Sequence, residues 1–271
     1  RQIAANSSRL DWSKATLTYS PDSGQILARF PRDGRCIDFD RPLNPCSVAS
    51  AYLLDTNRLN QTPVNLTSGF RELIQNWQQE KQAKLDRQLG QLPLSLTKLL
   101  ATTSAQLSFS PDETKILYLA TASATLPDQI IPPVPAASTQ AQVRRLVPGQ
   151  AYVYDIKEDR NFAIGQPLAP PPGQRPTGPA APTPRRGATI YSLPTPLPYN
   201  WFSSSGHLFW LASGTINVIE YDSTNFIALF SAPIVGNQVF TTTGGQRLYL
   251  LLDLDQDPKT LPELYFLNLR P

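Results

Sequence analysis

Short apolar segments interrupted by polar turns recur along the chain and predict antiparallel β-hairpins. Four segments share this pattern: 17–28, 107–118, 200–210 and 238–249. The first two carry Ser-Pro-Asp in the turn, where Pro21 and Pro111 preset the φ angle of the second turn position. Asp22 and Asp112 follow, and their side chains can accept hydrogen bonds from nearby backbone. We therefore expect these four residues to have a structural role in the turns.

A third apolar run follows each hairpin, and in three cases a fourth comes next. The third runs are 51–56, 151–156, 216–222 and 264–269, and the fourth runs are 63–66, 161–164 and 226–230. Repeated units of four antiparallel strands are typical of a β-propeller. The sequence thus predicts an all-β chain of about four blades, complete or part of a larger propeller, with a β-sandwich as the alternative. Residues 2–5 are a candidate outer strand for the last unit, which would close the ring.

One insertion, residues 68–101, has the pattern of helices rather than strands. Apolar residues Phe70, Leu73, Ile74 and Trp77 follow the helical period, and Gly90 and Pro93 are expected to end this first helix. A second short helix is predicted over residues 95–100, with Ser95 as its N-cap. The apolar stripe either packs back over a blade or binds a partner through Phe70 and Trp77, and we favour packing because the propeller is nearest.

Proline is concentrated in two further insertions, residues 127–148 and 167–198. The second contains eleven of the 27 prolines of the chain. Proline cannot join a sheet ladder, so both segments are predicted to be long surface loops of one domain that covers residues 1–271. Two arginine pairs, Arg144-Arg145 and Arg185-Arg186, lie in these segments and are candidates for partner binding.

The composition and the missing motifs limit the kinds of ligand and reaction that the sequence predicts. Charged residues make up 17% of the chain, and the formal net charge of +3 gives no indication of nucleic-acid binding. The sequence has no nucleophile elbow and no phosphate-binding glycine loop, and its one histidine and two cysteines do not make a common zinc site. His207 is expected to be a surface turn residue. We predict no catalytic residue, no metal and no cofactor.

The Ser-Pro-Asp hairpins, followed by strands such as Ala151-Tyr-Val-Tyr-Asp, resemble those of TolB-like, WD-repeat-related propellers. Residues 107–124, 151–161 and 200–222, with the helical insertion before them, resemble more closely the C-terminal propeller of PEGA-domain-containing envelope proteins of candidate-phylum bacteria. The third and fourth hairpins depart from the pattern, because Ser204-Ser205 and Thr242-Thr243 stand where the others have Pro-Asp.

This resemblance implies a compartment and a function class. It implies an extracytoplasmic module of the cell envelope, held to the membrane only through an anchor that would precede Arg1. The function expected is non-catalytic binding or scaffolding of a protein or an envelope polymer, and the alternative is a glycan-active or peptidase-associated propeller subunit. In that compartment Cys36 and Cys46 are candidates for a disulfide, with two free thiols as the other possibility. The ligand and the oligomeric state stay open.

Overall fold

The computed structural model describes residues 2–4, 10–22, 24–32, 48–56, 58, 60, 62–132, 140–165, 198–202, 204–241, 247–254 and 261–269. Cys36, Cys46, Arg185 and Arg186 lie outside the described residues, as do residues 133–139 and 166–197 of the two proline-rich segments. The disulfide and the second arginine pair therefore stay predictions.

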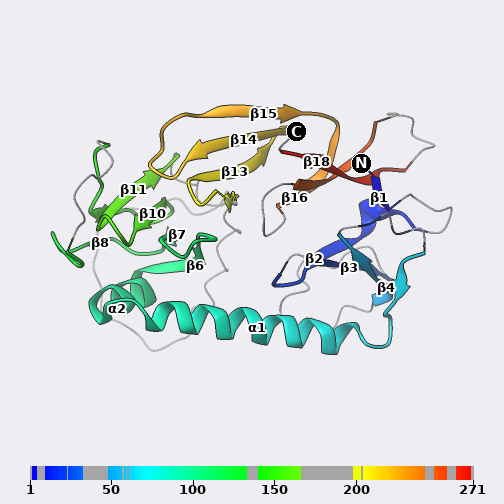
Figure 1. Cartoon of the computed structure of the whole chain (residues 1–271), viewed down its shortest axis with the longest axis horizontal. Helices are drawn as coiled ribbons and strands as arrows, with labels where there is room; N and C mark the ends of the chain where they lie inside the picture. The colour runs from blue at the N-terminus through cyan, green and yellow to red at the C-terminus, as the bar shows by residue number, and fades with distance from the viewer. Residues whose placement is uncertain are drawn as a thin grey trace, which may run out of the picture.

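The described part of the chain contains four antiparallel sheets of four strands each (Figure 1). The first sheet consists of β2 (Thr16–Tyr19), β3 (Gln25–Pro31), β4 (Val48–Asp55) and β5 (Val64–Asn65). The second consists of β6 (Ser104–Phe109), β7 (Lys115–Ala120), β10 (Ala151–Asp155) and β11 (Arg160–Ile164). The third consists of β12 (Asn200–Trp201), β13 (His207–Ala212), β14 (Thr215–Glu220) and β15 (Ile227–Ser231). The all-β prediction and the four hairpins are confirmed at this level.

The fourth sheet is completed by the beginning of the chain. Its strands β16 (Ile234–Thr241), β17 (Arg247–Leu252) and β18 (Glu263–Asn268) follow one another, and β1 (Gln2–Ala4) pairs antiparallel with β18. The partners are Gln2 with Tyr265 and Ala4 with Leu264. The outer strand expected from residues 2–5 is therefore present in the fourth sheet.

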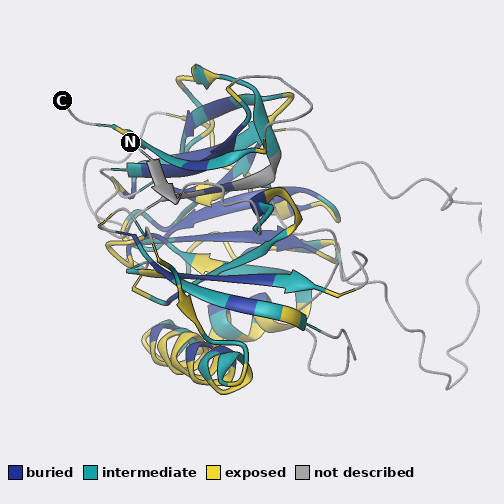
Figure 2. Ribbon diagram, turned by 90° about the vertical axis from the view of Figure 1, so that its right-hand side faces the viewer, coloured by how far each residue is buried: buried dark blue, intermediate teal, exposed yellow. Residues whose placement is uncertain are grey.

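Neighbouring sheets share apolar cores in the order first, fourth, third, second. Trp12 and Ile26 pack with Tyr249 and Leu264 between the first and fourth sheets. The other two shared cores are Phe209 and Ile216 with Leu248 and Leu250 between the third and fourth, and Leu117 and Val153 with Leu208 and Ile219 between the second and third. Figure 2 shows that the buried residues are concentrated in the strands of these stacked sheets. We call each of these contacts between neighbouring sheets a seam. In the seam between the first and fourth sheets, the Tyr249 hydroxyl also donates a hydrogen bond to the carbonyl of Thr56 at 2.8 Å.

Polar contacts also join the second and third sheets. The indole N–H of Trp201 donates to the carbonyl of Ser108 at 2.9 Å, and the amide of Asp112 donates to the Ser205 hydroxyl at 3.0 Å. The Lys115 ammonium lies 3.6 Å from the Asp155 carboxylate and 4.7 Å from the centre of the Tyr221 ring. Burial, followed by nearby carboxylates, raises the pKa of Tyr221 to about 12, so its hydroxyl is neutral at this seam.

Helix α1 (Phe70–Gly90) lies beside the first sheet and runs toward the second (Figure 1). Its first half packs Ile74 and Trp77 on Leu27 and Ala51 of the first sheet. At its far end, the Gln88 side chain donates to the Glu113 carboxylate in the β6–β7 turn at 2.8 Å. The helix is thus attached to both sheets, and the packing that we favoured for its apolar stripe is what the structure shows.

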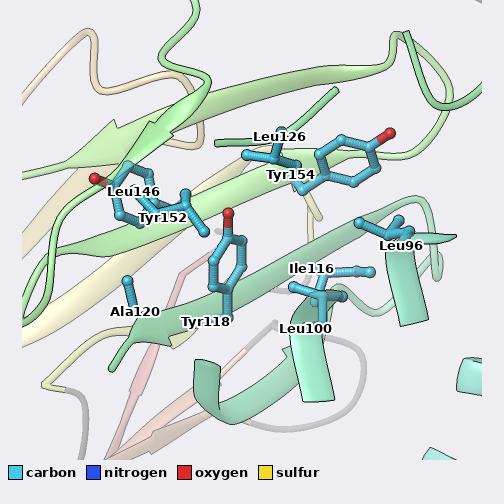
Figure 3. Packing of buried hydrophobic residues seen from close by; sticks show 9 residues of the cluster. All are labelled: Leu96, Leu100, Ile116, Tyr118, Ala120, Leu126, Leu146, Tyr152 and Tyr154. Carbon is cyan, nitrogen blue, oxygen red and sulfur yellow. The ribbon is translucent and has the colours of Figure 1, made fainter. Parts of the chain in front are cut away.

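Helix α2 (Leu94–Thr103) covers the face of the second sheet that points away from the third sheet. Leu96 and Leu100 of this helix pack against Ile116, Tyr118 and neighbouring side chains (Figure 3). The prediction that Ser95 is its N-cap is wrong, because the helix begins at Leu94, Pro93 occupies the cap position and no side chain caps it. Pro93 has φ −54° and ψ 138°, an extended conformation outside the helix, so the helix begins at the residue after it, one position before Ser95. None of the described helices is long and apolar enough to cross a membrane.

The two Ser-Pro-Asp turns have the bonds that the sequence predicts. Asp22 accepts hydrogen bonds from the Ser20 hydroxyl at 2.5 Å and from the Gly24 amide at 3.0 Å. Asp112 accepts from the Ser110 hydroxyl at 2.7 Å and from the Thr114 amide at 3.1 Å. Both aspartates therefore hold the turn together.

Replacing Asp112 by asparagine is expected to destabilise the protein at neutral pH and to matter less in acid. Burial alone would raise the pKa of Asp112, but the donors from Ser110 and Thr114 outweigh it and lower the pKa to about 2. A carboxylate whose folded pKa is depressed stabilises the fold above its unfolded pKa of 3.8, and this stabilisation is lost as pH falls toward 2. Because the turn is exposed and screened, the effect should stay within about 1 kcal/mol. Urea unfolding of both proteins at pH 7, 4 and 2.5 tests this, and a difference that grows in acid would contradict it.

Candidate functional site

Strand β15 is apolar in sequence and exposed in the structure. The exposed fractions are 59% for Phe226, which precedes the strand, 57% for Ile227 and 41% for Leu229. By contrast, every residue of β10, an inner strand of the second sheet, is buried. Contiguous exposed apolar side chains on a soluble protein indicate a contact surface. We call residues 226–231 the β15 edge.

The turn before β15 is held by two acidic side chains. The Thr224 hydroxyl donates to the Asp222 carboxylate at 2.6 Å, and the Asn225 side chain donates to the Glu220 carboxylate at 2.7 Å. Asn225 adopts a φ of 51°, in the left-handed region that asparagine tolerates. This turn fixes where β15 starts against β14.

The register of β15 contains an irregularity that includes Leu229. Ala228 pairs with Asn217, while Phe230 pairs with the next residue, Ile216, so Leu229 is an extra residue without a partner in β14. Such a β-bulge bends the strand and re-aims side chains. The bulge contributes to the exposure of Leu229. The next residue, Phe230, points the other way and packs into the core shared with the fourth sheet.

Aromatic rings lie beside this edge on the third sheet. The ring centres of Trp210 and Phe226 are 5.7 Å apart at 46°, and those of Tyr199 and Trp210 are 5.3 Å apart at 70°. Inclined rings of this kind pack on one another. They make an uneven apolar surface rather than a flat aromatic platform, so the geometry suits a protein segment better than stacked sugar rings.

Strands β5, β11, β15 and β1 each lie at an edge of their sheet, and they differ in length and in what covers them. Strand β5 is two residues long and β1 is three. Strand β11 is covered, because the Val143 amide donates to the Asn161 carbonyl and the Asn161 side chain donates to the Val143 carbonyl, both at 2.7 Å. Strand β15 is five residues long, and no described strand pairs with its outer side. Natural proteins shorten, charge or cover their edge strands, so a long uncharged edge is an exception that suits docking.

Arg144 and Arg145 were both candidates for partner binding, and the structure shows that Arg144 is engaged within the chain. Its guanidinium forms an ion pair with Asp159 at 3.1 Å and also donates to the Pro127 carbonyl. The reason lies in strand β9 (Arg145–Leu146), whose residues alternate between the two faces. Arg144 and Leu146 face inward, whereas Arg145 is exposed beside Thr125 of β8 (Ala124–Thr125). Arg145 stays a candidate.

The two helix residues that were candidates for partner binding pack against the first sheet. Trp77 is only 6% exposed and Phe70 is partly buried against the same cluster on the first sheet. These side chains therefore attach α1 to the first sheet. The missed candidates are Phe226, Ile227 and Leu229, which the sequence placed in a fourth strand but not on the surface.

Other polar sites are accounted for by local contacts. His207, expected in a surface turn, is instead the half-buried first residue of β13, where it pairs with Glu220 of β14, and its Nδ1 atom lies 3.0 Å from the Ser204 hydroxyl. A surface pocket of about 290 Å³ beside β4 is lined by Asp55, Arg58 and Asn60 among others. The Asp55 carboxylate is 3.2 Å from the Arg58 guanidinium, and the Asp55 amide donates to the Asn60 side chain. Within the described ranges, no three His, Cys, Asp or Glu side chains are placed to hold a metal ion.

Comparisons with known proteins do not assign the chain to a family. No family model matches it, and no curated protein does. Among solved structures, a eukaryotic initiation factor is similar over 94% of this chain and 40% of its own, at 11% identity and a TM-score of 0.30. Kuenenia stuttgartiensis hydrazine synthase is similar over 93% of this chain and 57% of its own, at 8% identity and a TM-score of 0.25. The chain thus spans 40% and 57% of the length of these two structures, and similarities at these TM-scores support no conclusion about function.

Proposed function

We propose that the chain is a non-catalytic binding or scaffolding module of the bacterial cell envelope, with its sheets as the four blades of a propeller. Three seams between sheets and the pairing of β1 with β18 support this architecture. In the remaining seam, α1 spans from the first blade to the second. The envelope location and the TolB-like or PEGA-type family rest on the resemblance of the Ser-Pro-Asp hairpins.

The module docks a protein at the β15 edge, and the exposed apolar edge strand is the observation that carries this proposal. An extended segment of a partner adds to the sheet, its backbone pairing with β15 and its apolar side chains covering Ile227 and Leu229. The alternative enzymatic function needs two acids facing each other across a cleft. The pocket beside β4 presents Asp55, which is paired with Arg58, and so no observation favours that alternative.

Photo-crosslinking in the producing cells is the test. A photoreactive residue at position 229 is expected to give crosslinked protein of defined mass. The same residue at Ala83, an exposed position on α1, is the matched control and is expected to give none. The expected contrast in yield is at least about tenfold, because strand pairing holds the partner within reach of position 229. Equal yields at both positions would show that the β15 edge is not a docking surface.

A further inference from the structure

We infer that the pocket beside β4 binds a small organic carboxylate with an apolar body, and that Arg58 holds the carboxylate. This site is separate from the β15 edge, which belongs to the third sheet, so it adds a second binding function to the module. The pocket has a volume of about 290 Å³, close to the smallest pockets that take small organic molecules. Its rigid wall, the orientation of Arg58 and the exposed Val64 indicate the class of ligand.

The pocket lies on the face of the first sheet that α1 covers in part. Asp55 pairs with Gln25, and two residues earlier Leu53 pairs with Leu27. Side chains two residues apart in a strand point to the same face. Leu27 and Leu53 belong to the cluster against which α1 packs, and no described residue of another sheet belongs to that cluster. In the described part of the chain, the pocket is therefore on the side of the first sheet that shares no apolar core with a neighbouring sheet.

The wall of the pocket at the end of β4 is held by hydrogen bonds on both sides. Asp55 lies beyond the two-residue strand β5, and the Asn60 side chain takes the place of a strand there. It accepts from the Asp55 amide at 2.9 Å and donates to the Asp55 carbonyl at 2.8 Å. The next residue, Thr56, is anchored to β3, because its hydroxyl donates to the Gly24 carbonyl at 2.9 Å. A wall fixed in this way needs little ordering when a ligand binds.

The Arg58 guanidinium is oriented by one neighbour and keeps two nitrogen atoms for a ligand. Its Nε atom lies 3.2 Å from the Asp55 carboxylate. No described residue accepts a hydrogen bond from Nη1 or Nη2. Two such nitrogens of a planar guanidinium donate two parallel hydrogen bonds to a carboxylate. Because the Arg58 side chain is 72% exposed, the ligand carboxylate stays next to water and its charge is not buried.

Charge alone would hold an anion only weakly in this pocket. Arg58 and Asp55 carry opposite charges, so their combined attraction for an anion is small. An apolar contact is available beside them, because Val64 lines the pocket at 56% exposure and pairs with Leu53 across the strands. A ligand that covers Val64 gains from removing this surface from water. The ligand therefore needs an apolar body next to its carboxylate.

The volume limits the size of that body. At about 30 Å³ per non-hydrogen atom, the share of one water molecule in the liquid, the pocket holds on the order of ten such atoms. A carboxylate with one aliphatic side chain is of this size. The same chemistry occurs in a free short acid and at the carboxyl end of a polypeptide whose last residue is aliphatic.

Titration of the full chain with N-acetyl-L-leucine, followed by nuclear magnetic resonance, tests the inference. We expect saturable shifts at the Arg58 Nε–H with a dissociation constant on the order of 1 mM. N-acetyl-L-leucinamide, which differs only in its neutral amide, should bind at least about tenfold more weakly because it lacks the charge-assisted pair of hydrogen bonds. This comparison uses the natural chain and depends on no variant.

A pair of variants assigns the binding to Arg58. Arg58→Gln is expected to weaken binding of N-acetyl-L-leucine at least about tenfold, whereas Arg71→Gln, at an exposed position on α1, should leave it unchanged. Circular dichroism checks that both variants are folded. No binding up to about 20 mM, equal affinity for the acid and the amide, or an Arg58→Gln variant that binds as tightly as the natural chain would overturn the inference.

A second pair of ligands distinguishes the two sources of the carboxylate. Acetylated Ala-Ala-Ala-Leu with a free carboxyl end is compared with the same peptide amidated at that end. If the free peptide binds at least as tightly as N-acetyl-L-leucine and the amidated one does not, the site takes the end of a polypeptide. If only N-acetyl-L-leucine binds, the site takes a free acid. Both results support carboxylate binding at Arg58, and neither depends on crosslinking at the β15 edge.

Discussion

Asp159→Ala is expected to lower the free energy of unfolding by about 3–5 kcal/mol, the cost of leaving a buried charge without its partner. The Asp159 side chain is 3% exposed and accepts from the Arg144 guanidinium at 3.1 Å, from the Ile130 amide at 2.9 Å and from the Tyr154 hydroxyl. Without the carboxylate, the Ile130 amide and the Tyr154 hydroxyl lose this acceptor, and the Arg144 guanidinium loses its ion pair while it keeps the backbone carbonyl of Pro127. Urea unfolding followed by circular dichroism gives the free energy.

Two further variants separate charge from backbone effects at this position. Asp159 has a φ of 52°, which asparagine adopts more easily than alanine. Asp159→Asn should therefore lower the free energy of unfolding by less than Asp159→Ala does. Asp128→Ala changes an exposed residue near Ile130 and should lower it by less than about 0.5 kcal/mol. If Asp159→Ala costs no more than Asp128→Ala, the ion pair does not hold the Arg144 segment to the turn between β10 and β11.

The stability contributed by Asp159 should depend on pH in a definite direction. Burial would raise the pKa of this carboxyl, but the donors Tyr154, Arg144 and Ile130 together lower it below 3.8. A depressed folded pKa means that the stabilisation is present above pH 3.8 and is lost as pH falls further. The difference between the natural chain and Asp159→Asn is thus expected to shrink in acid.

Trp77→Ala is expected to cost about 3–5 kcal/mol, as large-to-small changes at buried tryptophans do. The Trp77 ring fills the space between α1 and the first sheet, against the cluster of Leu27, Ala51 and Ile74. Removing it leaves a cavity in the contact that joins the helix to that sheet. Hydrogen exchange along α1 should become faster together with the loss of global stability measured in urea.

The neighbouring residue supplies the control for this prediction. Gln78 is exposed on the same helix, and alanine is a better helix former, so Gln78→Ala should change the free energy of unfolding by less than about 0.5 kcal/mol. If Trp77→Ala speeds exchange in α1 without lowering global stability, the helix is a peripheral arm rather than part of the seam between the first and second sheets.

Local signals were enough to predict most elements. The Ser-Pro-Asp turns positioned the first two hairpins, because proline and aspartate act on the backbone beside them. The helical period and the Gly90 stop located α1, which runs from Phe70 to Gly90. The start of α2 was missed because serine is a common cap, and the actual boundary depended on Pro93.

Exposure could not be predicted in this way. Arg144 and Arg145 are neighbours of the same type. Only the position of Asp159, in the turn between β10 and β11, gives Arg144 an interior ion pair, while Arg145 is left at the surface. Likewise 151–155 and 227–231 are both runs of five mostly apolar residues. One is buried throughout and the other is largely exposed.

By itself, then, the sequence determined which residues form strands, turns and the long helix, since these follow from interactions within about a dozen residues. The sequence also suggested that residues 2–5 complete the last sheet and that the helix packs on the protein. Only the tertiary structure decided that α1 reaches from the first sheet to the second, that Arg144 is an interior ion pair, and that β15 is left as an open apolar edge. Burial depends on which neighbours the rest of the chain supplies, and those neighbours are far away in sequence.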